Sequence, residues 1–192
     1  MMRSSILCKY HTLYRTVFSL LMILFSVISH AQKDTIDFPG DFLGEWHGDL
    51  KIYSTTGFKQ SVPMELHILP IDSMRFEWTL IYGEDKETGK RPYEMIIVDK
   101  SKGHFEIDEK NSILLDSYVL GGKFYQRFDV SGSNLLVSLE KIAENLIFEI
   151  VVSKTEPLRT TGDTVTEEGE QIPAVNSYQM MVRQRAFLSL KQ

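Results

Sequence analysis

The sequence predicts an all-β fold, a single antiparallel up-and-down β-barrel of about ten strands. From Phe42 onward, apolar and polar residues alternate in runs of roughly 6–12 residues, which is the pattern of strands with one buried face. Short clusters of Gly, Asn, Asp, Ser and Pro separate these runs and read as turns. Short connections favour a meander over a Greek key or a sandwich, and closing the meander into a barrel removes its two exposed edges.

The expected strands follow one another along the chain, with helical turns expected only at 35–42 and 141–145. One segment, 153–175, is long, acidic and almost without apolar residues. We expect a loop there, either a lid over the barrel mouth or a solvated excursion, and its composition favours the excursion. The ten expected strands are Leu43–Ser54, Phe58–Leu69, Met74–Tyr82, Pro92–Asp99, His104–Asp108, Ile113–Leu120, Lys123–Val130, Asn134–Glu140, Leu146–Ser153 and Val175–Ala186.

The first 31 residues have the features of a secretory signal peptide. Three basic residues precede the apolar run "VFSLLMILFSVIS", which is short for a membrane span, and Ser29-His30-Ala31 resembles a cleavage site. We expect cleavage before Gln32 and a periplasmic or secreted protein without stable membrane insertion; an uncleaved anchor is the alternative. The expected organisation is a signal peptide at 1–31, an N-terminal segment at 32–42 and a barrel domain at 43–192.

The exported chain is expected to be acidic and free of cysteine. The leader contains Cys8, which is the only cysteine, and it carries three of the 21 basic residues and none of the 26 acidic ones. Residues 32–192 therefore have a formal charge of −8 and form no disulfide. An acidic domain is a poor partner for nucleic acid, and 161 residues can bury a core without cross-links.

Strand alternation assigns side chains to the barrel lumen. Residues two apart share a face, so Trp78, Gln126 and Tyr178 are among the side chains expected inside. His47, His67 and His104 are one residue out of phase with the inward set and should point outward, which argues against a metal site. The lumen is either packed solid or an apolar pocket with a few polar groups.

The first expected strand begins with Gly44-Glu45-Trp46, preceded by Phe42. A Gly-x-Trp at this place in a secreted β meander resembles the calycin superfamily, which includes lipocalins, fatty-acid-binding proteins and nitrobindin-like barrels. The resemblance implies that Gly44 and Trp46 close one end of the barrel. It also implies an arginine of the last strand packed over the indole, for which Arg183 and Arg185 are the candidates.

The sequence lacks the ligand-binding motifs of two of these families. The nitrobindin-like proteins bind haem through a histidine near the C-terminus, but no histidine follows His104. The fatty-acid-binding proteins hold a carboxylate with Arg-x-Tyr on a late strand, which is missing here. An Arg-x-Tyr does occur earlier, as Arg91-Pro92-Tyr93, across a turn from Tyr82. We therefore expect no cofactor and no metal ion.

Arg91, Tyr93 and Tyr82 are the expected polar group at the open end of the lumen, with Gln126 and Tyr178 as helpers. A guanidinium and two phenols could hold the anionic end of an amphipathic ligand. The alternative places Arg91 in a solvated loop, bonded to Glu84, Asp85 or Glu87.

The sequence favours an exported binding protein for a small apolar or amphipathic ligand. An isomerase or hydrolase acting on a hydrophobic substrate in the same lumen is the first alternative, and a packed interaction module is the second. No catalytic residue is assigned, because the expected lumen is nearly without Asp, Glu and His.

Overall fold

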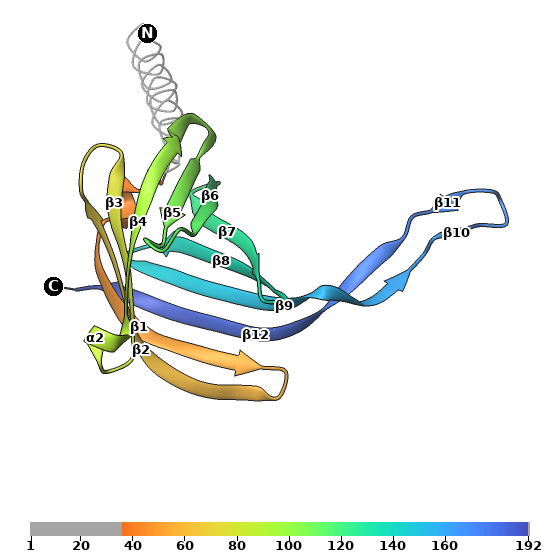
Figure 1. The fold of residues 1–192 in the computed structure, drawn as a ribbon, viewed down its shortest axis with the longest axis horizontal. Coiled ribbons are helices and arrows are strands. Elements are labelled where there is room, and N and C mark those ends of the chain that lie inside the picture. Colours follow the sequence, from red (N-terminus) through yellow and green to blue (C-terminus); the bar gives the residue numbers. More distant parts are fainter. Residues whose placement is uncertain (1–35, 192) are drawn as a thin grey trace, which may run out of the picture. The chain divides into compact units, whose positions relative to one another are not determined.

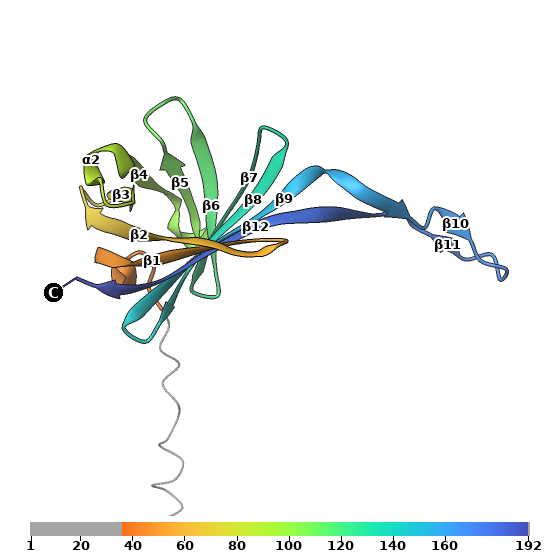
Figure 2. The same cartoon turned by 90° about the horizontal axis from the view of Figure 1, so that it is seen from below.

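The computed structural model describes residues 36–191, so the expected signal peptide at 1–31 and residues 32–35 lie outside the part described here. Ten strands form one closed antiparallel barrel in the order β1-β12-β9-β8-β7-β6-β5-β4-β3-β2. Figures 1 and 2 show the meander from two directions. Each expected strand corresponds to one barrel strand, which confirms the predicted fold class.

The barrel strands are 5–17 residues long and are joined mostly by tight turns. Leu120 and Lys123 are paired across the β6–β7 turn, for example, and both intervening glycines have positive φ, as a two-residue hairpin turn requires. The strands are β1 Gly44–Ser54, β2 Gly57–Pro70, β3 Arg75–Tyr82, β4 Lys90–Asp99, β5 His104–Asp108, β6 Leu114–Leu120, β7 Lys123–Val130, β8 Ser133–Ile142, β9 Asn145–Thr161 and β12 Val175–Leu190.

Within residues 36–191, short helices occur at three places. A 3-10 turn, η1 (Gly40–Phe42), precedes β1, and another, η2 (Lys100–Lys102), joins β4 to β5. The four-residue helix α2 (Lys86–Gly89) lies between β3 and β4, where Asp85 accepts hydrogen bonds from the first backbone amides. The helical turn expected at 141–145 is absent, because this segment is instead the hairpin turn between β8 and β9.

One end of the barrel is closed by aromatic side chains. Phe38 and Phe42 lie just before β1, and their ring centroids are 4.9 Å apart. The Phe38 ring also lies 4.9 Å from Phe105 and 5.5 Å from Phe124, so it spans strands far apart in the sequence. Trp46 is only 2% exposed beside them, and its Nε1 donates a hydrogen bond of 2.9 Å to the carbonyl oxygen of Phe42. A surface pocket of about 350 Å³ also lies at this end, with Pro39, Phe76 and Ile97 among its lining residues.

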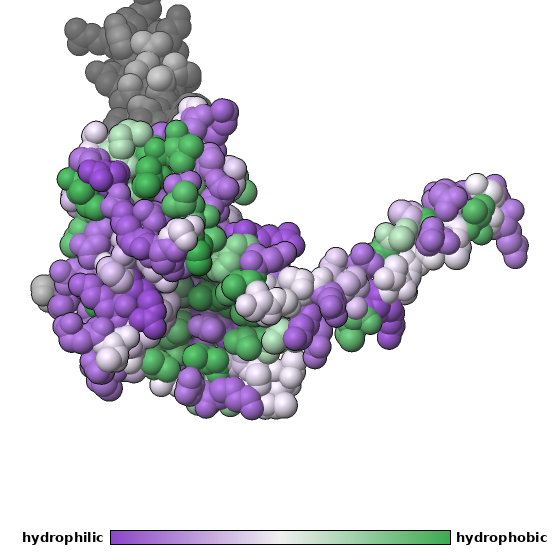
Figure 3. Space-filling view, viewed as in Figure 1, coloured by the Kyte–Doolittle hydropathy of each residue, from purple (hydrophilic) through white to green (hydrophobic). Residues whose placement is uncertain are grey.

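The opposite half of the lumen is lined by apolar side chains that remain partly exposed. They share the inward phase of the buried core but lie toward the ends of strands remote from Phe42. In Figure 3 green atoms line a hollow in the surface next to the place where β9 and β12 leave the barrel. These half-buried inward residues are Ile52, Leu80, Tyr82, Tyr93, Leu115, Phe128 and Ile150.

The segment 153–175 differs from the expected loop, because much of it is strand. β9 continues to Thr161, β12 begins at Val175, and their register pairs Val175 with Thr161. A smaller hairpin of β10 (Thr164–Val165) and β11 (Gln171–Ile172) follows at the tip. Figure 1 shows this two-stranded ribbon extending away from the barrel. The segment contains several Thr and Val residues, which have high strand propensity, a signal that the acidic composition obscured.

Candidate functional site at the open end of the barrel

The strand register brings the expected polar group to the open end. Tyr93 of β4 is directly opposite Trp78 of β3, and Arg91 is opposite Leu80. Since Trp78 and Leu80 face the lumen, Arg91 and Tyr93 share that face. Tyr82 is two residues beyond Leu80 on the same side and ends β3. The three side chains therefore lie where β3 and β4 meet the turn that contains α2.

Burial and neighbouring groups shift the pKa of both phenols. Burial raises the pKa of Tyr82, the neighbouring Tyr93 raises it further, and the positive charge of Arg91 opposes both effects. Burial also raises the pKa of Tyr93, with a contribution from Glu109 and an opposing one from Arg91. Electrostatic interactions weaken with distance, so these effects indicate that Tyr82, Tyr93 and Arg91 lie near one another. Both phenols are therefore protonated hydrogen-bond donors at neutral pH.

Arg91 is held by backbone carbonyl groups. Its Nη1 donates hydrogen bonds to the carbonyl oxygens of Thr88, at 3.0 Å, and Lys90, at 2.9 Å. Among the described residues it makes no ion pair, so the bonds expected in the alternative loop interpretation are not formed. The guanidinium is thus positioned by neutral groups and keeps N–H groups beyond Nη1 that can bind an anion.

Glu109 is a member of this group that the sequence interpretation missed. It continues the inward phase of Phe105 and Ile107 one position past the end of β5, and it is half-buried. Its negative charge raises the pKa of Tyr93. The alternation along β5 was a signal for this position, because Glu109 is two residues beyond Ile107. The open end therefore carries a carboxylate as well as a guanidinium.

The other expected ligand-binding residues lie in different places. Trp78 is buried in the lumen wall, with its ring centroid 5.0 Å from that of Phe124. Gln126 is also buried, and its Nε2 donates a hydrogen bond of 3.1 Å to the Ser117 hydroxyl. Tyr178 is exposed and lies on the part of β12 beyond the barrel, opposite Pro157, so it does not join the polar group.

Of the four residues expected to close the barrel, Gly44 and Trp46 lie at the plug, whereas Arg183 and Arg185 do not. Gly44 begins β1 with φ of +137°, a conformation suited to glycine, and Trp46 is buried in the plug. The cation over the indole is Lys141, whose Nζ lies 5.7 Å from the ring centroid and donates a hydrogen bond to the Asp41 carbonyl oxygen. Lys141 is two residues beyond Leu139 of β8, a phase relation that would have identified it.

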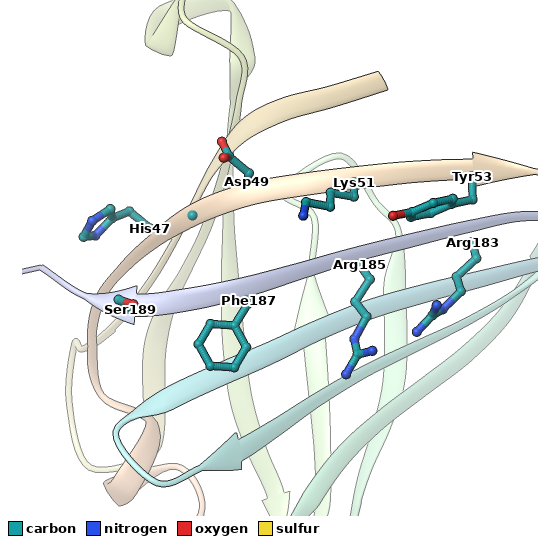
Figure 4. A pocket seen from close by; sticks show the side chains of 9 residues that line it. His47, Asp49, Lys51, Tyr53, Arg183, Arg185, Phe187 and Ser189 are labelled. Carbon is teal, nitrogen blue, oxygen red and sulfur yellow. The ribbon is translucent and has the colours of Figure 1, made fainter. Parts of the chain in front are cut away.

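Arg183 and Arg185 lie instead on the outside of the barrel. Both alternate with inward residues of β12, such as Gln184 and Ala186, so they face away from the lumen. Arg183 forms an ion pair with Glu149 of β9. Figure 4 shows both side chains extending from β12 away from β1, toward β9.

The histidines face outward, as their phase predicts. His67 contacts Glu65 at 2.9 Å, and His104 contacts Asp116 at 2.7 Å while stacking on Tyr118. Within residues 36–191, no three His, Cys, Asp or Glu side chains are grouped in a way that could hold a metal ion. A search of the same residues for a helix long and apolar enough to cross a membrane finds none.

A closed ten-stranded meander with an aromatic plug at one end defines a calycin-like β-barrel. In agreement, the chain resembles the solved structure of the S-type phycobiliprotein lyase CPES from Guillardia theta, with a TM-score of 0.51 and 7% sequence identity. The match covers 80% of this chain and 90% of that one. At this identity the likeness concerns the fold alone. No family model and no curated protein sequence matches the chain.

Proposed function

We propose that this protein binds a small amphipathic acid, with its apolar part in the open half of the lumen and its carboxylate near Arg91. We further propose that it does so after export, directed by the leader at 1–31. The observation that carries the binding proposal is the contrast between the two ends of the barrel. Most inward apolar residues beside the plug are fully buried, apart from Leu43, Ile97 and Val119, whereas a larger group toward the other end, including Tyr82, Tyr93 and Phe128, is half-buried.

The chemistry of the open end favours an acid with an apolar tail. Exposed apolar surface that faces inward gains free energy when a tail covers it, at about 25 cal/mol per Å². Arg91 supplies a positive charge that no side chain neutralises by direct contact among the described residues. Tyr82 and Tyr93 are protonated donors beside it. Pockets of this kind combine an apolar wall with a few polar groups that fix the orientation of the ligand.

Glu109 narrows the class of ligand that the site is expected to bind. Its carboxylate lies close enough to raise the pKa of Tyr93, so it would also repel the carboxylate of a bound acid. The site should therefore hold a simple fatty acid more weakly than Arg91 alone would allow. A ligand with an additional donor near its carboxylate would satisfy Glu109 as well.

A thermal-shift scan of amphipathic acids tests the proposal, with an open-chain tetrapyrrole as a separate arm because the structural neighbour is named a phycobiliprotein lyase. At a ligand concentration of 100 Kd, binding adds about 2.7 kcal/mol. For a chain of this size that raises Tm by several degrees, at about 2–4 °C per kcal/mol. Arg91→Ala should reduce the shift caused by an acid, and Glu109→Gln should increase it.

Lys59→Ala is the matched control, because Lys59 is exposed on β2 at a distance in sequence from the polar group. It should leave the shift unchanged. Equal shifts in the wild type and in Arg91→Ala would remove Arg91 from the site. No shift with any apolar acid or tetrapyrrole would contradict the proposed function.

A further inference from the structure

The ribbon that leaves the barrel, residues 155–181, is here called the arm. Pairing of β9 with β8 ends at Lys154, and pairing of β12 with β1 ends at Val182. Beyond those residues, β9 and β12 pair only with each other among the described strands. An isolated two-stranded ribbon is at best marginally stable in water. The arm would therefore be stabilised if another surface covered it.

The side chains of the arm are suited to such a contact. Leu158 is 70% exposed, and Val175, Tyr178 and Met180 are exposed as well. Single exposed apolar residues are ordinary, but several on one narrow ribbon indicate an interaction surface.

The tip of the arm is strongly acidic. No Lys or Arg occurs from Thr160 through Val182, whereas Asp163, Glu167, Glu168 and Glu170 all lie in this stretch. Three of these carboxylates follow one another closely in the turn between β10 and β11. The tip is therefore complementary to a cationic surface and repelled by an anionic one, such as an acidic membrane.

A cationic groove with a volume of about 670 Å³ lies on the outer face of β1 and β12. Lys51 is directly opposite Arg185, a like-charged cross-strand pair that destabilises the sheet unless an anion lies between the two. Arg183 follows on the same face, opposite Tyr53. Figure 4 shows the side chains of these residues arranged along the groove. The remaining lining residues are His47, Gly48, Asp49, Phe187 and Ser189.

The groove contains an exposed apolar side chain next to its positive charges. Phe187 is 57% exposed in it, opposite Asp49. Arg183 already contacts Glu149, whereas Nε of Arg185 is 3.9 Å from the same carboxylate. Lys51 and Arg185 are therefore the two cations best able to take additional carboxylates.

The arm cannot reach the groove of its own molecule. Val175 and Arg185 belong to the same strand, and ten residues of strand span about 33 Å at roughly 3.3 Å per residue. Folding back would break the pairing of Val175 with Thr161 and of Asn176 with Thr160. A second copy can present its arm without that loss.

We propose that the acidic tip of the arm of one molecule binds the β1–β12 groove of another, with Glu167, Glu168 and Glu170 facing Lys51 and Arg185. The contact joins two different surfaces, so it builds a ring or an open chain of molecules. Because the charges are near solvent, the association should weaken as salt concentration rises. It uses the outside of the barrel and is independent of ligand binding in the lumen.

Sedimentation velocity with two charge-reversed variants tests the contact. One variant carries Glu167→Lys, Glu168→Lys and Glu170→Lys, and the other carries Lys51→Glu and Arg185→Glu. Each alone should associate at least about tenfold more weakly than the wild type, because like charges then face each other. An equimolar mixture should associate again, because the reversed tip of one fits the reversed groove of the other.

A variant with Lys59→Glu and Lys90→Glu, two exposed lysines outside the groove, is the matched control and should associate like the wild type. Recovery of association on mixing also shows that both variants are folded. The proposal is overturned if the wild type is monomeric at every concentration and salt level tested. It is equally overturned if either variant associates like the wild type, or if the mixture stays monomeric.

Discussion

At the open end, the position of a residue in the alternation of its strand decides whether its side chain faces the lumen, and its chemical type does not. The sequence allows two positions for Arg91, in the lumen with Tyr93 or in a solvated loop. Its inward position follows from pairing with Leu80, which places it on the face that Trp78 and Tyr93 share. Glu109 was overlooked because it lies one residue past the strand whose phase it continues. Residues at strand ends are therefore the hardest to assign from alternation alone.

Tyr82 gives a prediction at this scale. Its pKa is raised by burial above the ordinary value of 10.0, so the unfolded chain loses this proton at a lower pH than the native protein. Between those two pKa values the unfolded state binds fewer protons, and stability falls as pH rises above about 10. Tyr82→Phe should remove this contribution and flatten the alkaline loss.

Urea unfolding as a function of pH measures this effect. Tyr118→Phe is the control, because Tyr118 is exposed on the outer face, where it stacks on His104. An alkaline slope that is the same in the wild type and in Tyr82→Phe would show that Tyr82 is solvated in the native protein.

At the scale of elements, all ten barrel strands could be predicted because alternation, turn residues and short connections agree. The arm could not, because β9 and β12 continue past the barrel without the apolar alternation that a buried face imposes. Residues 155–161 and 175–181 pair with each other, and neither face of that pairing is covered. The composition therefore predicted correctly that this segment is exposed to solvent, but it predicted a loop where the structure has strands.

The plug that η1 and the start of β1 form is an element whose contribution can be measured. Trp46 is buried beside Phe42 and donates a hydrogen bond to its carbonyl oxygen, and the Lys141 ammonium group lies 5.7 Å from the centroid of the indole ring. Trp46→Ala removes a large buried side chain and should lower the free energy of unfolding by about 3–5 kcal/mol. Ligand affinity at the opposite end should change little.

Equilibrium denaturation measures this loss, with Trp46→Phe as a comparison that keeps most of the volume and loses the indole N–H. The Phe variant should be the more stable of the two. A near-zero effect of Trp46→Ala would contradict the plug.

Considered as a whole, the molecule is asymmetric along the barrel axis. The aromatic plug closes the end where β1 begins, and the half-buried apolar residues line the end where the arm leaves. That asymmetry, together with Arg91 and the two phenols, is what favours ligand binding over a solid packed barrel. The sequence could predict the polar group and the plug, but the openness of one half follows only from the packing of all ten strands.

Quenching of Trp78 fluorescence by a fatty acid brominated in the middle of its chain tests the central claim most directly. The chain contains two Trp residues, so Trp46→Phe leaves Trp78 as the single reporter inside the lumen. A ligand bound in the open half brings bromine close to Trp78, whereas no Trp lines the outer β1–β12 groove. We expect stoichiometric quenching by the brominated acid and none by its unbrominated analogue. Binding detected by calorimetry without quenching of Trp78 would place the ligand outside the barrel and contradict the account.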